Sequence, residues 1–315
     1  MTVAIGVDIG GTKIAAGVVS ESGEILRVES EPTPQDATKI PPVVADLVDR
    51  LTGDEQVAGI GIGAAGFVGE DRSTVRFAPN IDWREEPLGQ QVRALVGLPV
   101  VVENDANAAA WGEFRFGAGE DTDDLLLITI GTGIGGGIVH QGQLFRGGFG
   151  VAAEIGHMRI VPDGILCGCG QHGCYEQYGS GSALVRDARE RVSNDDPGAA
   201  ALAALADGDL ARITGPGVTR LAQEGDALAI ELLADLGRWI GEGAAVLATI
   251  LDPSVIAIGG GVAAAGDLIL SHVVDAYETH LPARAHRPAA AVRLAALGNE
   301  AGIIGAADLA RVEPQ

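Results

Sequence analysis

The three cysteines of the chain, Cys167, Cys169 and Cys174, lie within eight residues of one another in a glycine-rich stretch. His157 lies ten residues before the first of them. Three thiolates and one imidazole form a complete tetrahedral ligand set for zinc, and a closed set leaves no coordination position for a substrate. The spacing therefore predicts a structural zinc ion held by His157, Cys167, Cys169 and Cys174.

Other interpretations of this cluster remain open. A disulfide would leave one cysteine over, and a role as buried free thiols does not explain why the cysteines gather in a glycine-rich loop. His172 is the alternative fourth ligand, and it is otherwise read as a solvated loop residue. Two carboxylates, Glu154 and Glu176, flank the cluster, so a bound metal would hold both in one arrangement.

Two glycine-threonine turns, Gly10–Lys13 and Gly131–Gly133, each lie between expected strands. Glycines allow an anion to approach the backbone N–H groups closely, and threonine hydroxyls add donors. Lys13 adds a positive charge, and Asp8 ends its strand where a carboxylate can hold hydrated Mg²⁺. One such turn alone is typical of an ordinary hairpin, so the phosphate-site prediction depends on the two turns matching.

The segment Glu103-Asn104-Asp105-Ala106-Asn107 follows a short apolar strand and opens a helix. Asn and Asp are common N-cap residues, so capping is one interpretation of this segment. The functional interpretation makes Asp105 a general base that accepts the proton of a substrate hydroxyl. Phosphoryl transfer to an alcohol requires such a base together with Mg²⁺ and donors for the phosphates.

The elements that must position these residues alternate between strands and helices, which predicts an α/β protein with mixed sheets. The expected strands cover 3–9, 14–20, 23–29, 57–63, 75–79, 99–102, 125–130, 135–140, 143–146 and 292–296. The expected helices cover about 43–51, 88–96, 105–116 and 299–311, with a mainly helical insertion from 182 to about 250.

The pattern of strand and glycine-rich turn occurs twice. Ile5–Thr12 resembles Leu127–Gly133, and Val57–Ala64 resembles Val255–Val262. Matching units of this kind predict an internal duplication.

Composition limits the classes of partner. At 315 residues the length favours about two domains, and the net charge is −22. Nucleic acids and anionic membranes select basic surfaces, so neither is expected as a partner. The longest apolar run, Gly243–Leu251, is too short to cross a bilayer. With no signal peptide recognisable at the N-terminus, we expect a soluble, cytoplasmic protein.

Taken in order, the motifs Asp-Ile-Gly-Gly-Thr-Lys, Glu-Asn-Asp-Ala-Asn, Gly-Thr-Gly-Ile-Gly-Gly-Gly and Glu-Ile-Gly-His with Cys-x-Cys-Gly-x2-Gly-Cys-x-Glu resemble the ROK family over essentially the whole chain. The resemblance implies the two-domain, duplicated actin/hexokinase-like (ribonuclease H-like) fold. It also implies an ATP-dependent kinase that phosphorylates glucose at the 6-hydroxyl, as the family's bacterial glucokinases do.

The resemblance further implies roles for individual residues. Asp105 is the general base. The expected sugar-binding residues are Gly66, Asn80, Asn104, Asp105, Glu154, His157 and Glu176. The expected ATP and Mg²⁺ site comprises Asp8, Gly10, Gly11, Thr12, Lys13, Gly131, Thr132, Gly133, Gly259, Gly260 and Gly261. Many family members have Pro-Gly where this chain has Ala65-Gly66, so the shape of the loop near Gly66 is left open.

The implied domains are residues 1–118, joined by a returning helix at 299–315, and residues 119–298, which carry the zinc loop 154–176. A homodimer or homotetramer is expected. The alternatives are a kinase for another hexose (N-acetylmannosamine, fructose or mannose), polyphosphate as the donor, and a sugar-responsive repressor. A repressor of this family carries a helix-turn-helix segment ahead of the first turn, whereas only seven residues precede Asp8 here.

Overall fold

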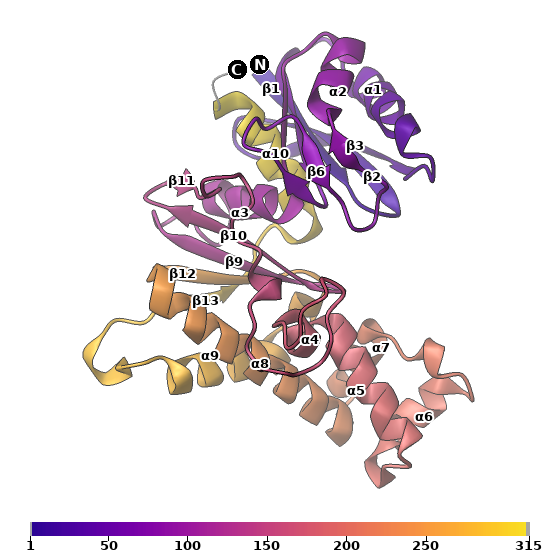
Figure 1. Ribbon diagram of the computed structural model, residues 1–315, viewed down its shortest axis with the longest axis vertical. Helices are drawn as coiled ribbons and strands as arrows, with labels where there is room; N and C mark the ends of the chain where they lie inside the picture. The colour runs from indigo at the N-terminus through magenta and orange to yellow at the C-terminus, as the bar shows by residue number, and fades with distance from the viewer. Residues whose placement is uncertain (1, 313–315) are drawn as a thin grey trace. The chain divides into compact units, whose positions relative to one another are not determined.

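A computed structural model describes residues 2–312 as a mixed α/β fold, which confirms the predicted fold class (Figure 1). By contact the chain divides into two compact units. The first unit comprises Met1–Leu127, Gly136–Ala153 and Ala296–Gln315, and the second comprises Ile128–Gly135 and Glu154–Ala295. The domain limits inferred from the sequence, 1–118 with 299–315 and 119–298, remain a prediction, and residues 1 and 313–315 lie outside the described residues.

The first unit is built on a five-stranded sheet in the order β3-β2-β1-β4-β8. Its strands are β1 (Thr2–Ile9), β2 (Lys13–Val19), β3 (Ile25–Pro32), β4 (Gln56–Ala64) and β8 (Val100–Asn104). The chain pairs β1, β2 and β3 antiparallel, whereas β1, β4 and β8 are parallel. Parallel strands end at the same edge of a sheet, so the residues after β1, β4 and β8 gather there.

Helices cover both faces of this sheet (Figure 1). They are α1 (Ile40–Leu51), α2 (Leu88–Val96), α3 (Asp105–Phe116) and α10 (Ala301–Val312), with short 3-10 turns η1 (Ala37–Lys39) and η7 (Gly298–Glu300). Val3, Ile5 and Val7 of β1 pack with α1 and α2 in one core cluster, while Ala4 packs with α10 in another. The two faces follow the period-two alternation of a strand.

Small residues let α10 approach the sheet closely. A Cβ added at Gly6 would lie 1.9 Å from the Ile303 carbonyl oxygen, and one at Gly61 would lie 1.7 Å from that of Ala306. Any larger side chain would push the helix away. The last helix therefore packs on β1 and β4 of the first unit, and residues 313–315 of the range predicted for it lie outside the described residues.

The second sheet has the order β11-β10-β9-β12-β13, which matches the first strand for strand. Its strands are β9 (Leu125–Ile130), β10 (Ile134–His140), β11 (Gln143–Leu144), β12 (Val255–Gly259) and β13 (Ala291–Leu294). The contact division between the units falls within β9 and β10. The common strand order agrees with the duplication predicted from the repeated motifs.

The rest of the second unit is largely helical (Figure 1). Its elements are η2 (Ile155–His157), α4 (Glu176–Gly179), α5 (Gly181–Ser193), η3 (Pro197–Ala199), α6 (Ala200–Ala206), η4 (Leu210–Arg212), α7 (Gly215–Gln223), α8 (Ala227–Leu251), η5 (Gly261–Ala265), α9 (Asp267–His280) and η6 (Arg284–His286). The helical insertion predicted from 182 to about 250 corresponds to α5, α6, α7 and α8.

Some boundaries differ from the sequence-based expectations. Helix α1 begins at Ile40, ahead of Pro41 and Pro42, because proline is tolerated in the first helical turn, where its missing N–H has no partner to lose. A third sheet consists of three short strands. The strand expected at 75–79 is β6 (Val75–Phe77), whereas its partners β5 (Phe67–Val68) and β7 (Arg84–Glu86) were not predicted. Strands of two or three residues are too short to show an alternating pattern.

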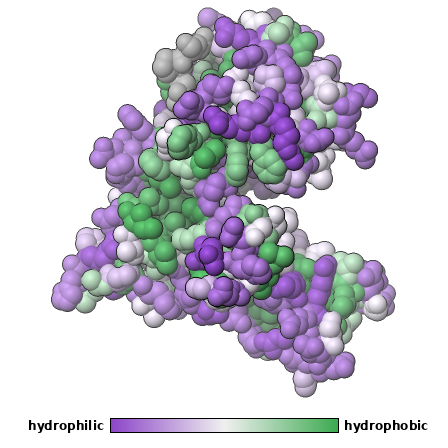
Figure 2. All heavy atoms as spheres, viewed as in Figure 1, coloured by the Kyte–Doolittle hydropathy of each residue, from purple (hydrophilic) through white to green (hydrophobic). Residues whose placement is uncertain are grey.

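None of the helices between residues 2 and 312 is both long enough and apolar enough to cross a lipid bilayer. On the face shown in Figure 2, hydrophilic residues predominate over α1, in keeping with the high net charge of −22.

Candidate functional site

The second unit brings His157, Cys167, Cys169 and Cys174 together, with one ligand atom of each within 4.8 Å of all the others. Two thiolates on one tetrahedral zinc ion are about 3.8 Å apart, since each lies about 2.3 Å from the metal. Cys169 Sγ and Cys174 Sγ are 3.6 Å apart, and Cys167 Sγ is 3.7 Å from His157 Nδ1. The ligand types and spacings therefore fit zinc.

The alternative ligand, His172, takes no part in this cluster. Its Nδ1 pairs with the Gly164 carbonyl oxygen at 2.9 Å, and the side chain is exposed. The loop turns back at Gly173, which has a φ of 77° and lies so close to Val161 that a Cβ would meet its carbonyl oxygen at 1.6 Å. This turn is open only to glycine and returns Cys174 toward the other ligands.

Two tyrosines fix the zinc loop to its surroundings. Tyr175, next to Cys174, is fully buried, and its hydroxyl donates to the Ile240 carbonyl of α8 at 2.7 Å. The hydroxyl of Tyr178 accepts the N–H of Ile165 at 2.9 Å. The loop is thereby attached to the longest helix of its unit at one end and braced at the other.

The predicted sugar-facing residues of the second unit lie around this loop. Glu176 Oε1 is 3.8 Å from His157 Nδ1 and accepts a hydrogen bond from Cys167 Sγ at 2.9 Å. A Cβ on Gly133 would lie 2.6 Å from Glu176 Oε2, so this carboxylate also borders the second glycine turn. Glu154 is exposed and immediately precedes η2.

In the first unit, Asn104 rather than Asp105 caps α3. Its Oδ1 accepts the N–H of Asn107 at 3.0 Å, and its Nδ2 donates to the Gly66 carbonyl at 3.1 Å. The second bond brings together Asn104 and Gly66, two of the expected sugar-binding residues. Capping therefore does not account for Asp105, which is the first residue of the helix.

Burial raises the pKa of the Asp105 carboxyl above its usual value, against the lowering effect of backbone N–H groups such as that of Ala106, which donates to Oδ1 at 2.9 Å. A carboxylate is a stronger base when its pKa is nearer neutral, so this environment suits proton acceptance.

Asp8 lies at the end of β1, opposite Gly63 of β4, which in turn pairs with Glu103 of β8. Because the parallel strands end together, Asp8 and Asp105 come near one another. The pKa of Asp8 is raised to about 6, chiefly by burial and also by the charge of Asp105, against the lowering effect of Lys13. A cation such as Mg²⁺ is the natural partner for carboxylates in this environment.

The first glycine turn is an exposed hairpin end. The Gly10 N–H donates to the Lys13 carbonyl at 3.0 Å, and the Thr33 hydroxyl donates to the Gly10 carbonyl at 2.7 Å. Gly11 lies against Asn80, because a Cβ on Gly11 would be 3.3 Å from the Asn80 Cβ. The structure thus places Asn80 beside the first turn.

The second turn, Gly131–Gly133, is held by the start of α5. The N–H groups of Gly181 and Ser182 donate to the carbonyls of Gly131 and Thr132 at 2.8 and 3.4 Å. Gly131 and Thr132 border a cavity of about 590 Å³ that Gly261 also lines. The preceding residue, Gly260, has a φ of 81°, and a Cβ there would lie 2.4 Å from the Ile130 carbonyl oxygen.

Most of the residues that line this cavity were not among the predicted site residues. They include side chains from α5 and α7, namely Ser182, Val185, Arg186, Arg189, Pro216 and Thr219. The local signals are two helix starts, Ser180 ahead of α5 and Thr214 ahead of α7, whose side chains accept the N–H groups of Ala183 and Gly217. Such a cap predicts a helix and carries no information about what the helix faces.

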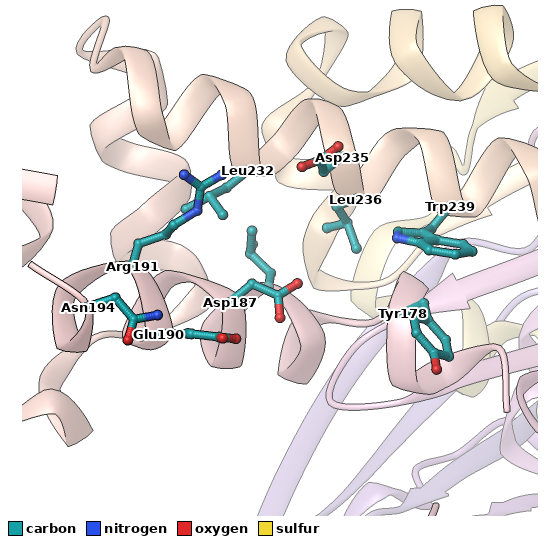
Figure 3. A pocket seen from close by; sticks show the side chains of 10 residues that line it. Tyr178, Asp187, Glu190, Arg191, Asn194, Leu232, Asp235, Leu236 and Trp239 are labelled. Atoms are coloured by element: carbon teal, nitrogen blue, oxygen red, sulfur yellow. The ribbon is translucent and has the colours of Figure 1, made fainter. Parts of the chain in front are cut away.

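A second cavity, of about 340 Å³, lies between α5 and α8 (Figure 3). The rings of Tyr178 and Trp239 stand at one end, with centroids 4.8 Å apart. Arg191 stands at the other end, paired with Asp196 and Glu231. No residue of the predicted site lines this cavity, so it has no part in the predicted chemistry.

Each unit therefore contributes one half of the predicted set: a carboxylate pair beside a glycine turn in the first, and a metal-ligand cluster, a second turn and a cavity in the second. The model of the ROK family matches residues 4–313, and the chain belongs to this family.

Individual relatives narrow the comparison beyond the family as a whole. The chain is 52% identical over 311 residues to a glucokinase from Streptomyces coelicolor, covering 99% of this chain and 98% of that protein. A ROK glucokinase from Streptomyces griseus, solved in complex with glucose and AMPPNP, is 52% identical with a TM-score of 0.90, covering 99% of this chain and 100% of that one. A ROK hexokinase from Thermus thermophilus is 34% identical with a TM-score of 0.80, covering 97% and 96%.

Proposed function

We propose that this protein is an ATP-dependent glucokinase, which transfers the terminal phosphoryl group of ATP to the 6-hydroxyl of glucose. The observation that carries the proposal is the 52% identity, over nearly all of both chains, to a kinase whose structure contains glucose and AMPPNP. Fold, motif order and the disposition of residues within each unit support the same assignment.

Asp105 is the proposed general base. It accepts the proton of the 6-hydroxyl as the oxygen attacks the phosphoryl group, and the ADP oxygen leaves on the opposite side. Its raised pKa follows from burial, and Asn104 supplies the helix cap in its place. The carboxylate is thereby available for proton transfer.

The phosphates and their metal ion are assigned to the glycine turns. Backbone N–H groups of Gly10–Lys13 and Gly131–Gly133 would bind phosphate oxygens, with Thr12, Thr132 and Lys13 as further donors. Asp8 would hold Mg²⁺ through its hydration shell. The cavity beside Thr132 and the segment Gly259–Gly261 would take the adenosine, since it is large enough for a nucleoside and opens on the second turn.

The sugar hydroxyls are assigned to Gly66, Asn80, Asn104, Glu154, His157 and Glu176, together with Asp105. His157 would serve two purposes, because one ring nitrogen can bind zinc while the other donates to a hydroxyl. Zinc on His157, Cys167, Cys169 and Cys174 would be structural. It would hold His157 and Glu176 in place and contribute no step of the reaction.

Glucose is the proposed substrate among hexoses. A site that hydrogen-bonds a hydroxyl rejects an analogue without it by about 10⁴–10⁵, whereas epimers and N-acetyl derivatives are separated less strongly. N-acetylmannosamine, fructose and mannose are the competing substrates, and a sugar-responsive repressor is the competing class. The homodimer or homotetramer expected from the family resemblance and the cytoplasmic location expected from the sequence remain predictions.

The test is a coupled assay of ADP release, and of sugar phosphate with polyphosphate as donor, across a panel of hexoses. We expect the highest kcat/KM with glucose and ATP. A higher value for another hexose would retain a sugar kinase and reject the glucokinase. No turnover of any sugar, together with glucose binding, would favour the repressor.

A further inference from the structure

Glu103, the residue before Asn104, is a buried carboxylate that the proposed chemistry does not use. Its side chain is 1% exposed, and it has four polar partners, three of which donate hydrogen bonds to it. Oε2 accepts from Arg72 Nη2 at 2.7 Å and lies 2.7 Å from Arg146 Nε. Oε1 accepts from the Asn104 N–H at 2.9 Å and from Asn107 Nδ2 at 3.1 Å. A buried charge is stable only with such a complete set of partners.

Through Oε1, Glu103 fixes the first turn of α3. Oε1 accepts hydrogen bonds from the Asn104 N–H and the Asn107 side chain, three residues apart in that turn. The Asn104 side chain in turn accepts the N–H of Asn107. Asp105 lies between these two residues. Its direction is therefore set by a carboxylate that lies in the sheet rather than in the helix.

Through Oε2, Glu103 reaches two loops. Arg72 closes a turn by donating its N–H to the Gly69 carbonyl at 3.1 Å, and it accepts the N–H of Val102 at 2.8 Å. Arg146 donates through Nη2 to the same Gly69 carbonyl at 2.8 Å. Both arginines that pair with Glu103 therefore also donate to the Gly69 carbonyl, which fixes the turn at 69–72.

Arg146 also begins the glycine-rich loop 146–152. Its carbonyl accepts the N–H of Ala152 at 3.1 Å, which closes the loop. Gly150 lies against the 68–70 segment, where a Cβ would be 2.7 Å from the Val68 carbonyl oxygen. Two residues after Ala152 the chain reaches Glu154.

We propose that Glu103 is a positioning residue for sugar binding. Through Arg72, Arg146 and the first turn of α3, it holds segments 66–72, 103–107 and 146–152 in one arrangement. These segments carry Gly66, Asn104 and Asp105 and lead to Glu154. Glu103 does not itself contact the substrate, and its role in sugar binding rests on the proposed kinase function.

The chain offers a matched control. Asp308 of α10 is another buried carboxylate, 3% exposed, that accepts from Trp111 Nε1 at 2.9 Å and pairs with Arg115 and Arg311 at 3.4 Å. Glu103→Gln and Asp308→Asn each remove one buried charge shared by two arginines. A general loss of stability affects both variants alike, whereas a positioning role distinguishes them.

The expected result is a rise of about tenfold or more in the KM for glucose in Glu103→Gln, with a lower kcat and a KM for ATP within about twofold of the wild type. Asp308→Asn should keep both constants within about twofold. Equal kinetic behaviour of the two variants would overturn the proposal.

Two further measurements keep the test decisive. If Glu103→Gln does not fold, Arg146→Gln takes its place in the test. This variant leaves Glu103 paired with Arg72, and it should also raise the KM for glucose. Amide hydrogen exchange in segments 66–72 and 146–152 should become faster in Glu103→Gln and in Arg146→Gln. It should remain unchanged there in Asp308→Asn. Unchanged hydrogen exchange in these segments would overturn the positioning role of Glu103, whether or not the protein phosphorylates a sugar. Absence of sugar phosphorylation by the wild type would separately reject the proposed kinase function.

Discussion

Replacing Asp8 with Asn should stabilise the protein in the absence of Mg²⁺ and nucleotide while removing catalytic activity. Asp8 is partly buried at the end of β1, and its folded-state pKa is raised from 3.8 to about 6, chiefly by burial. A raised carboxyl pKa means that folding favours the protonated form. The unfolding free energy therefore falls as pH rises from about 3.8 to about 6 and stays reduced above that range.

The size of the effect follows from the shift. At about 1.4 kcal/mol per pKa unit, ionised Asp8 costs about 3 kcal/mol at pH 7.5, or about 2 kcal/mol after allowing for its partial exposure. Asparagine has nearly the shape of the protonated acid and carries no charge. The stabilisation by Asp8→Asn should therefore be about 2 kcal/mol at pH 7.5 and about half that at pH 5.

Urea unfolding at the two pH values, without Mg²⁺ or nucleotide, measures this difference. Because the chain carries a net charge of −22, removal of any carboxylate relieves some repulsion, so exposed Asp54 of the same unit supplies the control variant Asp54→Asn. The reasoning fails if Asp8→Asn is no more stable than Asp54→Asn at pH 7.5, or if its advantage does not change with pH.

Three further outcomes are expected. Washed wild-type protein should hold one zinc per chain, and Cys169→Ala should lose metal and thermal stability together, because structural zinc binding contributes on the order of 10–16 kcal/mol; metal analysis far below one equivalent would contradict this. Asp105→Asn should lower kcat by roughly 10²–10⁴ while glucose affinity, measured by calorimetry, is largely kept; near-normal turnover would exclude Asp105 as the base. Thr132→Val should raise the KM for ATP more than that for glucose, because it removes a donor at the second turn; equal rises in a folded variant would reject the phosphate assignment.

Local features could be predicted from the sequence because their causes lie within a few residues. Apolar runs such as 125–130 predicted strands that the structure shows at the same positions. Cys167, Cys169 and Cys174 are close in the chain, so a glycine-rich loop is enough to bring them together. The repeated strand-turn motifs predicted an internal duplication, and the common strand order of the two sheets agrees with it.

Choices between similar neighbouring residues depended on tertiary structure. His157 and His172 are both near enough in sequence to complete the ligand set, and only the fold of the loop turns His172 outward to the Gly164 carbonyl. Asn104 and Asp105 are both residue types that commonly cap helices. In the structure Asn104 is the cap, and its side chain also donates to the carbonyl of Gly66, 38 residues away.

The sequence by itself determined the kinds of element, the side chains of the candidate metal cluster and the family to which the chain belongs. Tertiary structure alone determined the burial and the partners of each charged side chain. Glu103 has the sequence context of an ordinary strand residue, and only the fold pairs it with the distant residues Arg72 and Arg146. The pKa of Asp8 is raised chiefly by burial at the end of β1 and further by the charge of Asp105. Burial and pairing depend on groups far apart in the chain, and local patterns contain no information about which of those groups will meet.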